Sequence, residues 1–542
     1  MSLINLYKKE KDAPQTLAIT MFFASSVAAV FILISIITFS SLSIINLKYS
    51  YVVFYIIMMI IYVGGKRLSL RRLIKTFVFS NSKLTKRVSN KIRNTKLSYI
   101  EKQSHINFYR GITDNRENFV ESVIIILHAL HSSIILFFVL LFMWFVSTES
   151  FVITVLVMVL SIYFHTKYLQ KDYEVQYNKA QMQEQEFAKV FHQLLHGFKE
   201  LKLNSKMSLE HFDYLKNTLT KLQKLTFQMC KLMINNFNVF FDVLLLFYLG
   251  IITFLIPEII TIESQELSKI LIVAIFMNSP VGSLFGAIPF WIKSNNAVAK
   301  LYSIEKTLDD VIGKNETFNI LPDYIFDEFQ KIQFKNVKYN HYDREGNICF
   351  TLGSLNLDIN RGELIFIVGG NGSGKSTLMK LICGLYNTAE GEILIDGHKL
   401  SKSNLPAFYN LFSIIMSDYF LFEKLYGLQN IDNKKIDDLL KIMNLDKKTA
   451  VINNIFTTTR LSTGQRKRLA MIVSLLQDKQ IYIFDEWAAD QDVNFRSYFY
   501  EVILNDLKNK GKTIIAVSHD DRFYHVADRV MKLEYGNGEF IV

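Results

Sequence analysis

The chain has 542 residues, half of them apolar, and a formal net charge of +11, so it is too long for one ordinary domain and too apolar for an ordinary basic soluble protein. These features fit apolar membrane spans that alternate with basic cytoplasmic stretches. A basic nucleic-acid binder is the other interpretation of the charge, and its sequence would not contain apolar runs of this length. The three cysteines form no CxxC pair, which excludes a disulfide framework and a cysteine-rich metal site.

Apolar runs cluster in roughly the first 300 residues, and each is close to the length that crosses hydrocarbon as a helix. The first run begins near Leu17 and is too long for a signal-peptide core, so we interpret it as a retained span. The predicted spans are 17–45, 51–65, 122–147, 150–169, 234–257 and 268–292.

The connections between these runs indicate how the chain crosses the membrane. Lys66–Lys96 contains eleven Lys or Arg residues and no acidic residue, whereas the short links on the other side contain little positive charge. By the positive-inside rule, we expect a multi-pass protein of the cytoplasmic (inner) membrane, with both termini and the connections 66–121 and 170–233 in the cytoplasm. Helical spacing in 172–206 predicts helices that extend the spans below the membrane; a solvated linker is the alternative.

Several polar residues interrupt the predicted spans. Such groups are costly in hydrocarbon and usually face the bundle interior or a water-filled cavity, so they predict a substrate path. The alternative is that they form hydrogen bonds between helices. Pro280 and Pro289 in the sixth span predict bent helices. The candidate path residues are His128, His131, Asn235, Asn238, Asp242 and Asn278.

The composition changes after about residue 320, where short apolar β-rich stretches alternate with helical ones. This rhythm predicts an α/β domain with a largely parallel sheet. We therefore expect two domains. Residues 1–320 form an α-helical transmembrane domain with six spans and long cytoplasmic helical extensions, and residues 321–542 form an α/β nucleotide-binding domain.

The second domain contains a complete phosphate loop, in the sequence ELIFIVGGNGSGKST. An apolar strand, a glycine loop and a helix follow one another, which is the context that the motif requires. Lys375 is expected to reach the β- and γ-phosphates and Ser376 to bind Mg²⁺, so ATP or GTP should bind here with Mg²⁺. The candidate phosphate-binding residues are Gly369, Asn371, Gly372, Ser373, Gly374, Lys375, Ser376 and Thr377.

Four carboxylates follow a second apolar strand, in IYIFDEWAADQD (481–492). A carboxylate at the end of a strand beside a phosphate loop is where the metal-orienting acid of such nucleotidases lies, so Asp485 is the candidate metal ligand. Glu486 points to a different face of the strand end and is the candidate general base for water. Asp490 and Asp492 fall in the next turn, where we expect them to shape a loop.

Two further motifs complete a known pattern. LSTGQRKRLA (461–470) is close to the LSGGQ signature of ATP-binding-cassette (ABC) proteins, and IIAVSHDDR supplies His519 at a strand end. With the six predicted spans, the chain resembles an ABC exporter half-transporter over essentially its whole length. GGNGSGKST, DEWAADQD and GFKELKLN (197–204) resemble most closely the cyclic-peptide exporters, which are associated with peptide siderophores, lipopeptides and lasso-type microcins. In that subfamily Trp487 takes the place of the usual Pro.

The resemblance implies roles for individual residues. Asp485 would be the Walker B acid that helps to hold Mg²⁺, and Glu486 would be the catalytic carboxylate. Asp492 would be the D-loop acid, which signals between two nucleotide domains, and His519 would contact the γ-phosphate. The signature residues that would close over the ATP held by a partner chain are Ser462, Gly464 and Gln465.

Two positions remain open within the resemblance. The adenine should stack on an aromatic residue in YNHY, where Tyr342 and His341 compete. ABC domains usually have Gln where this chain has Ser417, followed by Asp418. Ser is too short to reach the metal as Gln does, so either a water bridges the gap or Asp418 contributes.

The sequence therefore predicts a homodimeric ATPase in the lipid bilayer that exports a peptide-like small substrate and binds no nucleic acid. Two chains are expected because ABC sites need a phosphate loop from one chain and a signature from the other, with Asn204–Glu210 a contact to the nucleotide domain. One alternative is a broad multidrug or lipid exporter of the same architecture. A second is an ATP-gated membrane sensor or immunity protein without vectorial transport. A soluble ATPase of the DNA-repair type is a third, and the six spans argue against it.

Overall fold

The computed structural model describes residues 6, 16–41, 49–102, 105–164, 167, 170–232, 234, 240–255, 264–312, 326, 329–343, 345–428 and 431–541. Contacts within the chain divide it into two compact units: Met1–Arg93 with Gln103–Asp310, and Asn94–Lys102 with Val311–Val542. The division falls somewhat before the predicted boundary at residue 320. In addition, a short segment of the first half packs with the second unit.

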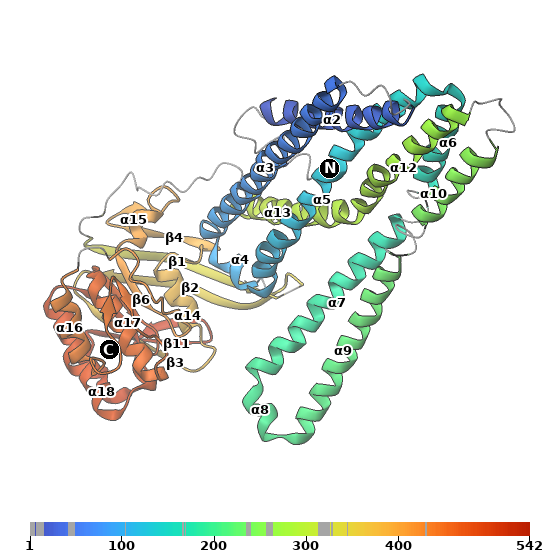
Figure 1. Cartoon of the computed structure of the whole chain (residues 1–542). Coiled ribbons are helices and arrows are strands. Elements are labelled where there is room, and N and C mark those ends of the chain that lie inside the picture. Colours follow the sequence, from blue (N-terminus) through green and yellow to red (C-terminus); the bar gives the residue numbers. More distant parts are fainter. Residues whose placement is uncertain are drawn as a thin grey trace. The chain divides into compact units, whose positions relative to one another are not determined.

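The first unit is built of helices (Figure 1). They are α2 (Thr16–Ser41), α3 (Tyr49–Arg93), α5 (His105–Val146), α6 (Thr148–Phe164), α7 (Gln170–His196), α8 (Phe198–Leu203), α9 (Ser205–Leu232), α10 (Phe240–Gly250), the π-helix η4 (Ile251–Leu255), α12 (Ser264–Gly286) and α13 (Ile288–Ile312). Pro280 lies inside α12, and Pro289 lies in the first turn of α13, where a missing N–H breaks no helical hydrogen bond. The predicted sixth span is therefore shared by two helices.

Among the residues that the structure describes, four helical stretches are long and apolar enough to cross a membrane: Thr16–Thr38, Tyr49–Arg93, Phe119–Val146 and Glu266–Ile312. Two shorter apolar helices, Thr148–Phe164 and Asp242–Phe254, overlap the fourth and fifth predicted spans. The second predicted span, 51–65, continues without a break to Arg93, so the span and its extension are one helix. The helix continues through the basic stretch because that stretch contains no proline, which would interrupt the backbone hydrogen bonds of the helix.

The segment 170–232 forms a hairpin of long helices, as the helical spacing predicted. Helices α7 and α9 lie side by side and are joined through the short α8 (Figure 1). Gln183 donates to the carbonyl oxygen of Thr218 (3.3 Å). At the turn of the hairpin, large apolar side chains are exposed. We call Phe198, Leu203, Leu209 and Phe212 the apolar tip.

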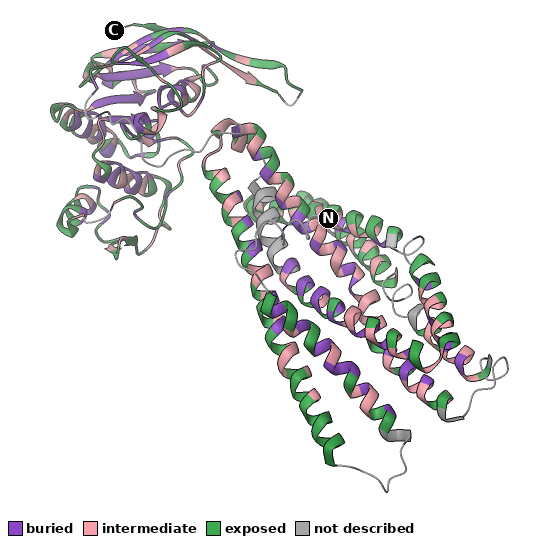
Figure 2. Ribbon diagram, turned by 90° about the horizontal axis from the view of Figure 1, so that it is seen from above, coloured by how far each residue is buried: buried purple, intermediate pink, exposed green. Residues whose placement is uncertain are grey.

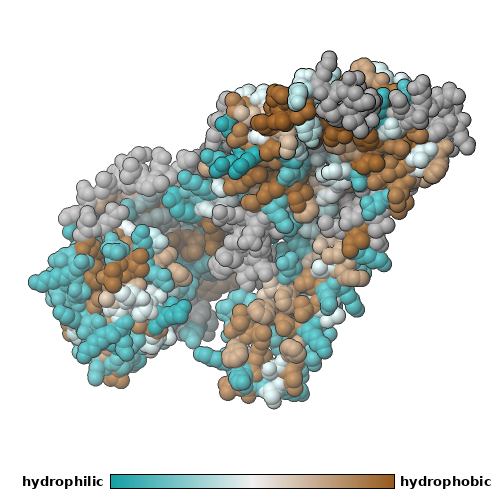
Figure 3. Space-filling model, viewed as in Figure 1, coloured by the Kyte–Doolittle hydropathy of each residue, from teal (hydrophilic) through white to brown (hydrophobic). Residues whose placement is uncertain are grey.

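Small residues and apolar side chains hold the membrane helices together. Gly65 of α3 lies so close to α2 that a Cβ there would be 3.1 Å from the Cβ of Ser25. Leu33 of α2, Val139 of α5 and Val273 of α12 belong to one buried cluster. Other apolar side chains gather on the surface of these helices (Figure 3), as expected for helices that face lipid.

The second unit contains two main sheets. The six-stranded sheet has the order β12-β11-β3-β10-β9-β6, and the four-stranded sheet has the order β2-β1-β4-β5. The strands are β1 (Lys331–Tyr342), β2 (Ile348–Asn360), β3 (Leu364–Gly369), β4 (Glu390–Ile395), β5 (His398–Lys399), β6 (Phe412–Ile415), β7 (Val451–Ile452), β8 (Ile455–Phe456), β9 (Ile481–Phe484), β10 (Thr513–Val517), β11 (Arg529–Glu534) and β12 (Asn537–Phe540).

The second unit also contains the helices α4 (Leu97–Lys102), α14 (Lys375–Ile382), α15 (Leu405–Tyr409), α16 (Asn433–Ile442), α17 (Thr463–Gln477), η5 (Trp487–Asp490), α18 (Val493–Tyr498), η6 (Phe499–Ile503), α19 (Leu504–Asn509) and η7 (Asp521–Val526). Of these, α14, α17 and α19 pack against strands of the six-stranded sheet. Strands β3, β9 and β10 are buried (Figure 2). Their apolar runs are continuous because a parallel sheet is covered on both faces. The predicted α/β fold with a largely parallel sheet is confirmed.

Candidate nucleotide site and membrane cavity

The loops that carry the predicted ATP chemistry lie at one edge of the six-stranded sheet. Strands β3, β10 and β9 are neighbours and run parallel, so their carboxyl ends share that edge. Gly369 ends β3, Asp485 follows β9, and His519 comes two residues after β10. Ligands of open α/β sheets bind at this edge. The topology therefore brings Asp485 and His519 to the phosphate loop, although each is more than a hundred residues from it in the sequence.

The phosphate loop has the backbone that its glycines allow. Gly369, Gly372 and Gly374 all have positive φ, and a Cβ on Gly369 would collide with the carbonyl oxygen of Leu533. Helix α14 begins at Lys375, directly after the left-handed Gly374. Its first N–H groups, which have no helical partner, are therefore available to an anion at the loop.

Two side chains of the loop are suited to phosphate. Lys375 is buried, and its ammonium donates to the carbonyl oxygens of Gly369 and Gly370, both at 3.0 Å. The hydroxyl of Ser373 is buried and has no hydrogen-bond partner among the described residues. Buried polar groups are nearly always paired, and a phosphate oxygen would supply the missing partner. Asn371 is exposed in the same loop.

The predicted metal ligands lie next to each other. Asp485 is buried, and its Oδ2 accepts a hydrogen bond from the hydroxyl of Ser376 (3.2 Å). Mg²⁺ prefers oxygen ligands and is usually bound through one or two carboxylates together with substrate phosphates. These residues fit Mg²⁺ in that manner. In the described part of the chain, no group of three His, Cys, Asp or Glu residues is arranged to hold a metal ion by protein ligands alone.

Ser417 reaches the same carboxylate through its backbone. The N–H of Ser417 lies 3.4 Å from Oδ2 of Asp485, and Asp418 is exposed. The two strand ends are held together, because the N–H of Asp485 donates to the carbonyl oxygen of Ile415 (2.8 Å). The side chain of Ser417 is thus not needed for this contact, and a metal contact of Asp418 stays a prediction.

Glu486 and His519 form a direct pair. Oε1 of Glu486 lies 2.9 Å from Nε2 of His519, across the end of the sheet. Glu486 has φ of 50°, in the left-handed region that residues with a side chain seldom adopt. This turn allows adjacent carboxylates to meet different partners, Ser376 for Asp485 and His519 for Glu486. The sequence predicted that separation.

The structure distinguishes the two candidates for stacking on adenine. His341 is engaged: its Nε2 lies 3.0 Å from the hydroxyl of Thr377, and its ring packs edge-on against Tyr339. Burial lowers the pKa of His341, so its neutral form is favoured. Tyr342 is exposed at the end of β1. The geometry therefore favours Tyr342 as the stacking partner and His341 as a support for the phosphate loop.

The signature forms the start of helix α17. Ser462 and Gln465 make a capping box, in which each backbone N–H donates to the other side chain (3.3 and 3.4 Å). Gly464 packs against the segment 481–492, which we call the acidic segment. A Cβ on Gly464 would lie 2.6 Å from the carbonyl oxygen of Asp490. The positive end of the helix dipole thus lies at the signature, and it suits an anion.

Asp492 links two helices. Its Oδ1 accepts from the N–H of Phe495 at the start of α18 (2.9 Å), and its Oδ2 accepts from Arg468 of α17 (2.6 Å). The hydrogen bond from Phe495 and then the one from Arg468 lower the pKa of Asp492. The carboxylate is therefore ionised at neutral pH and fixes α17 relative to α18.

Helix α4 contributes contacts that the sequence did not suggest. Glu101 accepts hydrogen bonds from Lys380 of α14 (2.7 Å) and from the hydroxyl of Tyr386 (2.6 Å). The ammonium of Lys102 lies 5.8 Å from the centre of the Tyr342 ring. Helix α4 thus contacts both the phosphate-loop helix and the candidate adenine-stacking residue. The only signal in the sequence is that Glu101 is the first acid after the basic stretch 66–96.

The polar residues of the predicted substrate path are not gathered in one place. His131 is buried and hydrogen-bonded to the hydroxyl of Ser25 in α2 (3.0 Å), which is the alternative of a bond between helices. His128 and Asp242 are exposed. Asn235 and Asn238 lie outside the described residues. Of the four candidates that the structure describes, Asn278 lines the cavity described next.

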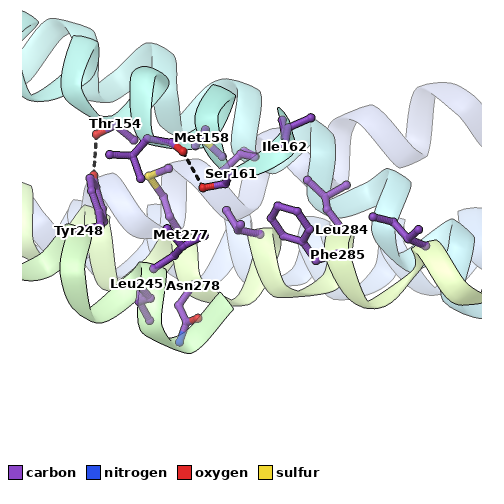
Figure 4. A pocket seen from close by; sticks show the side chains of 16 residues that line it. Thr154, Met158, Ser161, Ile162, Leu245, Tyr248, Met277, Asn278, Leu284 and Phe285 are labelled. Atoms are coloured by element: carbon purple, nitrogen blue, oxygen red, sulfur yellow. Dashed lines mark hydrogen bonds between the residues drawn. The ribbon is translucent and has the colours of Figure 1, made fainter. Parts of the chain in front are cut away.

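A cavity of about 300 Å³ lies between α5, α6, α10 and α12 (Figure 4). Its wall is almost entirely apolar, because the hydroxyl groups of the lining residues form hydrogen bonds with other groups of the helices. Thr154 bonds to Ser150 and Tyr248 (both 2.6 Å), and Ser161 donates to Val157 (2.6 Å). Residues that line the cavity include Leu136, Met158, Leu245, Met277, Asn278 and Phe285. This cavity therefore has an almost entirely apolar wall, on which Asn278 is the one predicted path residue among those that the structure describes.

Comparison with known proteins identifies the family. The family model described as ABC transporter matches residues 352–489, which include the phosphate loop and most of the acidic segment. The protein named ATP-binding protein SyrD, from Pseudomonas syringae pv. syringae, is 30% identical over 460 residues, which cover 82% of this chain and 80% of that protein. This chain belongs to the ABC transporters. The transporter is accordingly an ATPase whose ATP hydrolysis is coupled to transport.

Two further similarities bear on the architecture of the transporter. A protein named ATP-dependent lipid A-core flippase, from Syntrophus aciditrophicus (strain SB), is 26% identical over 283 residues, or 48% of this chain and 46% of that protein. A solved structure of a bacterial Atm1-family ABC exporter with ATP bound superposes with a TM-score of 0.74 at 16% identity, over 96% of this chain and 93% of that one. The transporter therefore has the ABC exporter fold, in which a helical membrane domain precedes the ATPase domain.

Proposed function

We propose that this transporter is a homodimeric exporter that moves a peptide-like substrate across the cytoplasmic membrane. The substrate class is a cyclic peptide, peptide siderophore, lipopeptide or microcin-like molecule. The observation that carries the proposal is the apolar cavity with the amide of Asn278, in the same chain as an ATP site. A peptide has apolar side chains that such a wall accepts and backbone amides that need a partner once water is removed. The resemblance of DEWAADQD to the cyclic-peptide exporters supports the same class.

The arrangement of the ATP site supports hydrolysis by general base catalysis. Glu486 would take a proton from the attacking water, and the His519 ring, 2.9 Å from its carboxylate, would keep it oriented. Lys375 would move from the loop carbonyls to the phosphates. Ser376 and Asp485 would hold Mg²⁺, which when bound would offset the negative charge of the phosphates.

The homodimer is proposed because each chain supplies one phosphate loop and one signature. The apolar tip is exposed on the chain by itself, and its burial would be favourable. Exposed aromatic side chains of Phe420, Phe422 and Tyr426 line surface pockets of the ATPase unit. We propose that the apolar tip of one chain binds these pockets on its partner, with Asn204–Glu210 in the contact.

The orientation follows from charge. We propose that the ATPase unit, both termini and the basic part of α3 lie in the cytoplasm. Segment 66–96 has eleven basic residues and no acidic one, and such segments remain on the cytoplasmic side. Labelling of single cysteines placed at Ser82 and Glu149 in intact cells tests this. Reagent that cannot cross the membrane should modify position 149 alone.

Reconstituted transporter in liposomes tests the substrate class. ATPase activity should rise more with a cyclic peptide than with the linear peptide of the same sequence, because a closed ring loses less conformational entropy on binding. Leu245→Trp should remove this stimulation by filling the cavity. Leu246→Trp is the matched control, since that neighbouring side chain is exposed and lies outside the cavity wall.

Uptake of the peptide into inverted vesicles then separates transport from sensing. ATP-dependent accumulation in the lumen supports an exporter, and stimulation without accumulation supports the ATP-gated sensor. Equal stimulation by hydrophobic dyes, with no preference for the ring, would favour a multidrug exporter.

A lipid exporter is the second candidate, and the nearly apolar wall of the cavity favours it. Alkyl chains need no hydrogen-bond partner, so Asn278 would be dispensable for them. Asn278→Leu should therefore preserve stimulation by a lipid and reduce stimulation by a peptide. Lipid-only liposomes provide the baseline for both measurements.

A further inference from the structure

The backbone of Glu486 needs a restraint. Its φ of 50° is disfavoured for a residue with a Cβ, and such a conformation persists only when surrounding contacts enforce it. The side-chain contact to His519 orients the carboxylate, and it does not hold the backbone. The restraint must therefore come from groups that contact the peptide units on either side of Glu486.

Lys467 supplies one such contact. It is 5% exposed, lies in α17 two residues after the signature, and its ammonium donates to the carbonyl oxygen of Glu486 (2.7 Å). The same ammonium pairs with the carboxylate of Asp490, also at 2.7 Å. A single cation thus connects the start and the end of the turn that follows β9.

Trp487 supplies the reciprocal contact. Its indole N–H donates to the carbonyl oxygen of Lys467 (2.9 Å), and its ring stacks on Phe499 with the centroids 4.5 Å apart. The Trp487 ring is 1% exposed and therefore cannot move without disturbing the core. We call Lys467, Glu486, Trp487 and Asp490 the lysine–tryptophan clasp.

Stability alone is a weak reason for this arrangement. The ion pair between Lys467 and Asp490 adds little net stability, because the Asp490 side chain is 43% exposed and water screens the attraction. Here the ammonium contacts the backbone of Glu486 and leaves its carboxylate free to meet His519. The clasp therefore sets where the carboxylate points without neutralising it.

We propose that Lys467 and Trp487 are positioning residues for ATP hydrolysis, which hold the Glu486 backbone in its left-handed turn and tie it to the signature helix. A movement of α17 would then reach Glu486 and Trp487 through these two hydrogen bonds of 2.7 and 2.9 Å. The proposal rests on Glu486 being the general base. It also explains why a bulky indole stands among the four carboxylates of the acidic segment.

Steady-state ATPase kinetics of the full-length transporter in liposomes test the clasp. Lys467→Met keeps the length of the side chain and removes the ammonium. We expect kcat to fall by about tenfold to 100-fold, the range for a misplaced catalytic group, with KM for ATP unchanged. Trp487→Phe keeps an aromatic ring against Phe499 and removes the N–H, so kcat should fall by a smaller factor.

Two controls separate positioning from general damage. Lys512→Met removes an ammonium that pairs with Asp478 (2.8 Å) at the opposite end of strands β9 and β10, and it should leave kcat unchanged. In a Glu486→Gln background, Lys467→Met should cause no further loss, because the group that it positions is already absent.

The outcomes decide between the two assignments. If Glu486→Gln retains full turnover, the general-base assignment fails and the clasp has nothing to position. If Glu486→Gln is inactive and Lys467→Met retains the wild-type kcat, the clasp is overturned while the general base stands. Equal losses from Lys467→Met in both backgrounds also overturn it. Should Lys467→Met fail to fold, Trp487→Phe decides: lower kcat at unchanged KM supports the proposal, and unchanged kcat refutes it.

Discussion

Replacing Glu486 by Gln and Asp490 by Asn compares two similar changes within one turn of the chain. Each substitution exchanges a carboxylate for an amide of the same shape. The amide introduced by Glu486→Gln would still be able to bond to His519, because the 2.9 Å contact needs only an oxygen or nitrogen at that position. Protein folding and ATP binding should therefore survive, whereas proton abstraction from water should not.

The structure sets the size of the two effects. Loss of a general base typically costs about 100-fold or more in turnover, and 100-fold corresponds to about 2.7 kcal/mol in the activation free energy. The side chain of Asp490 is 43% exposed, and as an amide it would still accept from Lys467. Loss of a partly exposed ion pair costs about 1 kcal/mol or less, so turnover should fall by no more than about fivefold.

The assay is ATPase turnover of purified transporter, together with retention of labelled ATP after rapid gel filtration. If ATP binding closes the proposed dimer and hydrolysis reopens it, Glu486→Gln should retain ATP. Asp490→Asn should release nucleotide as the wild type does. An inactive Asp490→Asn beside an active Glu486→Gln would refute the assignment of the acidic segment.

Three further experiments test other parts of the site. Mixing Lys375→Ala chains with Ser462→Asp chains should restore ATP binding or closure, because one composite site of the mixed dimer would carry neither substitution. Ser462→Asp is suitable because Asp also caps a helix, so the substitution adds only a negative charge that faces phosphate. Equal behaviour of mixed and separate mutants would contradict sites built from two chains. Tyr342→Ala should raise KM for ATP by about fivefold to 100-fold, as expected for loss of about 1–3 kcal/mol of base stacking, and Tyr342→Phe should not. The pKa of His341 is lowered in the folded protein, so the unfolded state binds more protons. The unfolding free energy should therefore fall as the pH decreases below 6.5, the ordinary pKa of histidine. Thermal unfolding of His341→Gln should accordingly depend less on pH.

Local patterns in the sequence were sufficient for the fold class and the nucleotide motifs. An apolar strand, a glycine loop and a helix must occur consecutively, so the phosphate loop at Gly369–Ser376 could be recognised without the fold. The apolar runs, the basic segment 66–96 and the change of composition near residue 320 likewise depend only on neighbouring residues. An apolar run marks the span and not the ends of its helix: the span 51–65 is part of α3, which continues to Arg93.

Contacts between distant residues required the tertiary structure. Tyr342 and His341 are adjacent aromatic residues in the sequence, and only the tertiary structure shows that His341 contacts Thr377. The histidines of the third span fitted either a substrate path or a bond between helices, and only the tertiary structure shows that His131 bonds to Ser25, more than a hundred residues away. The contacts between Lys467 and Trp487 could not be predicted either, because the residues next to Lys467 in the sequence do not show that its side chain is buried. Such pairings depend on how strands and helices pack in three dimensions, which spacing along the chain does not specify.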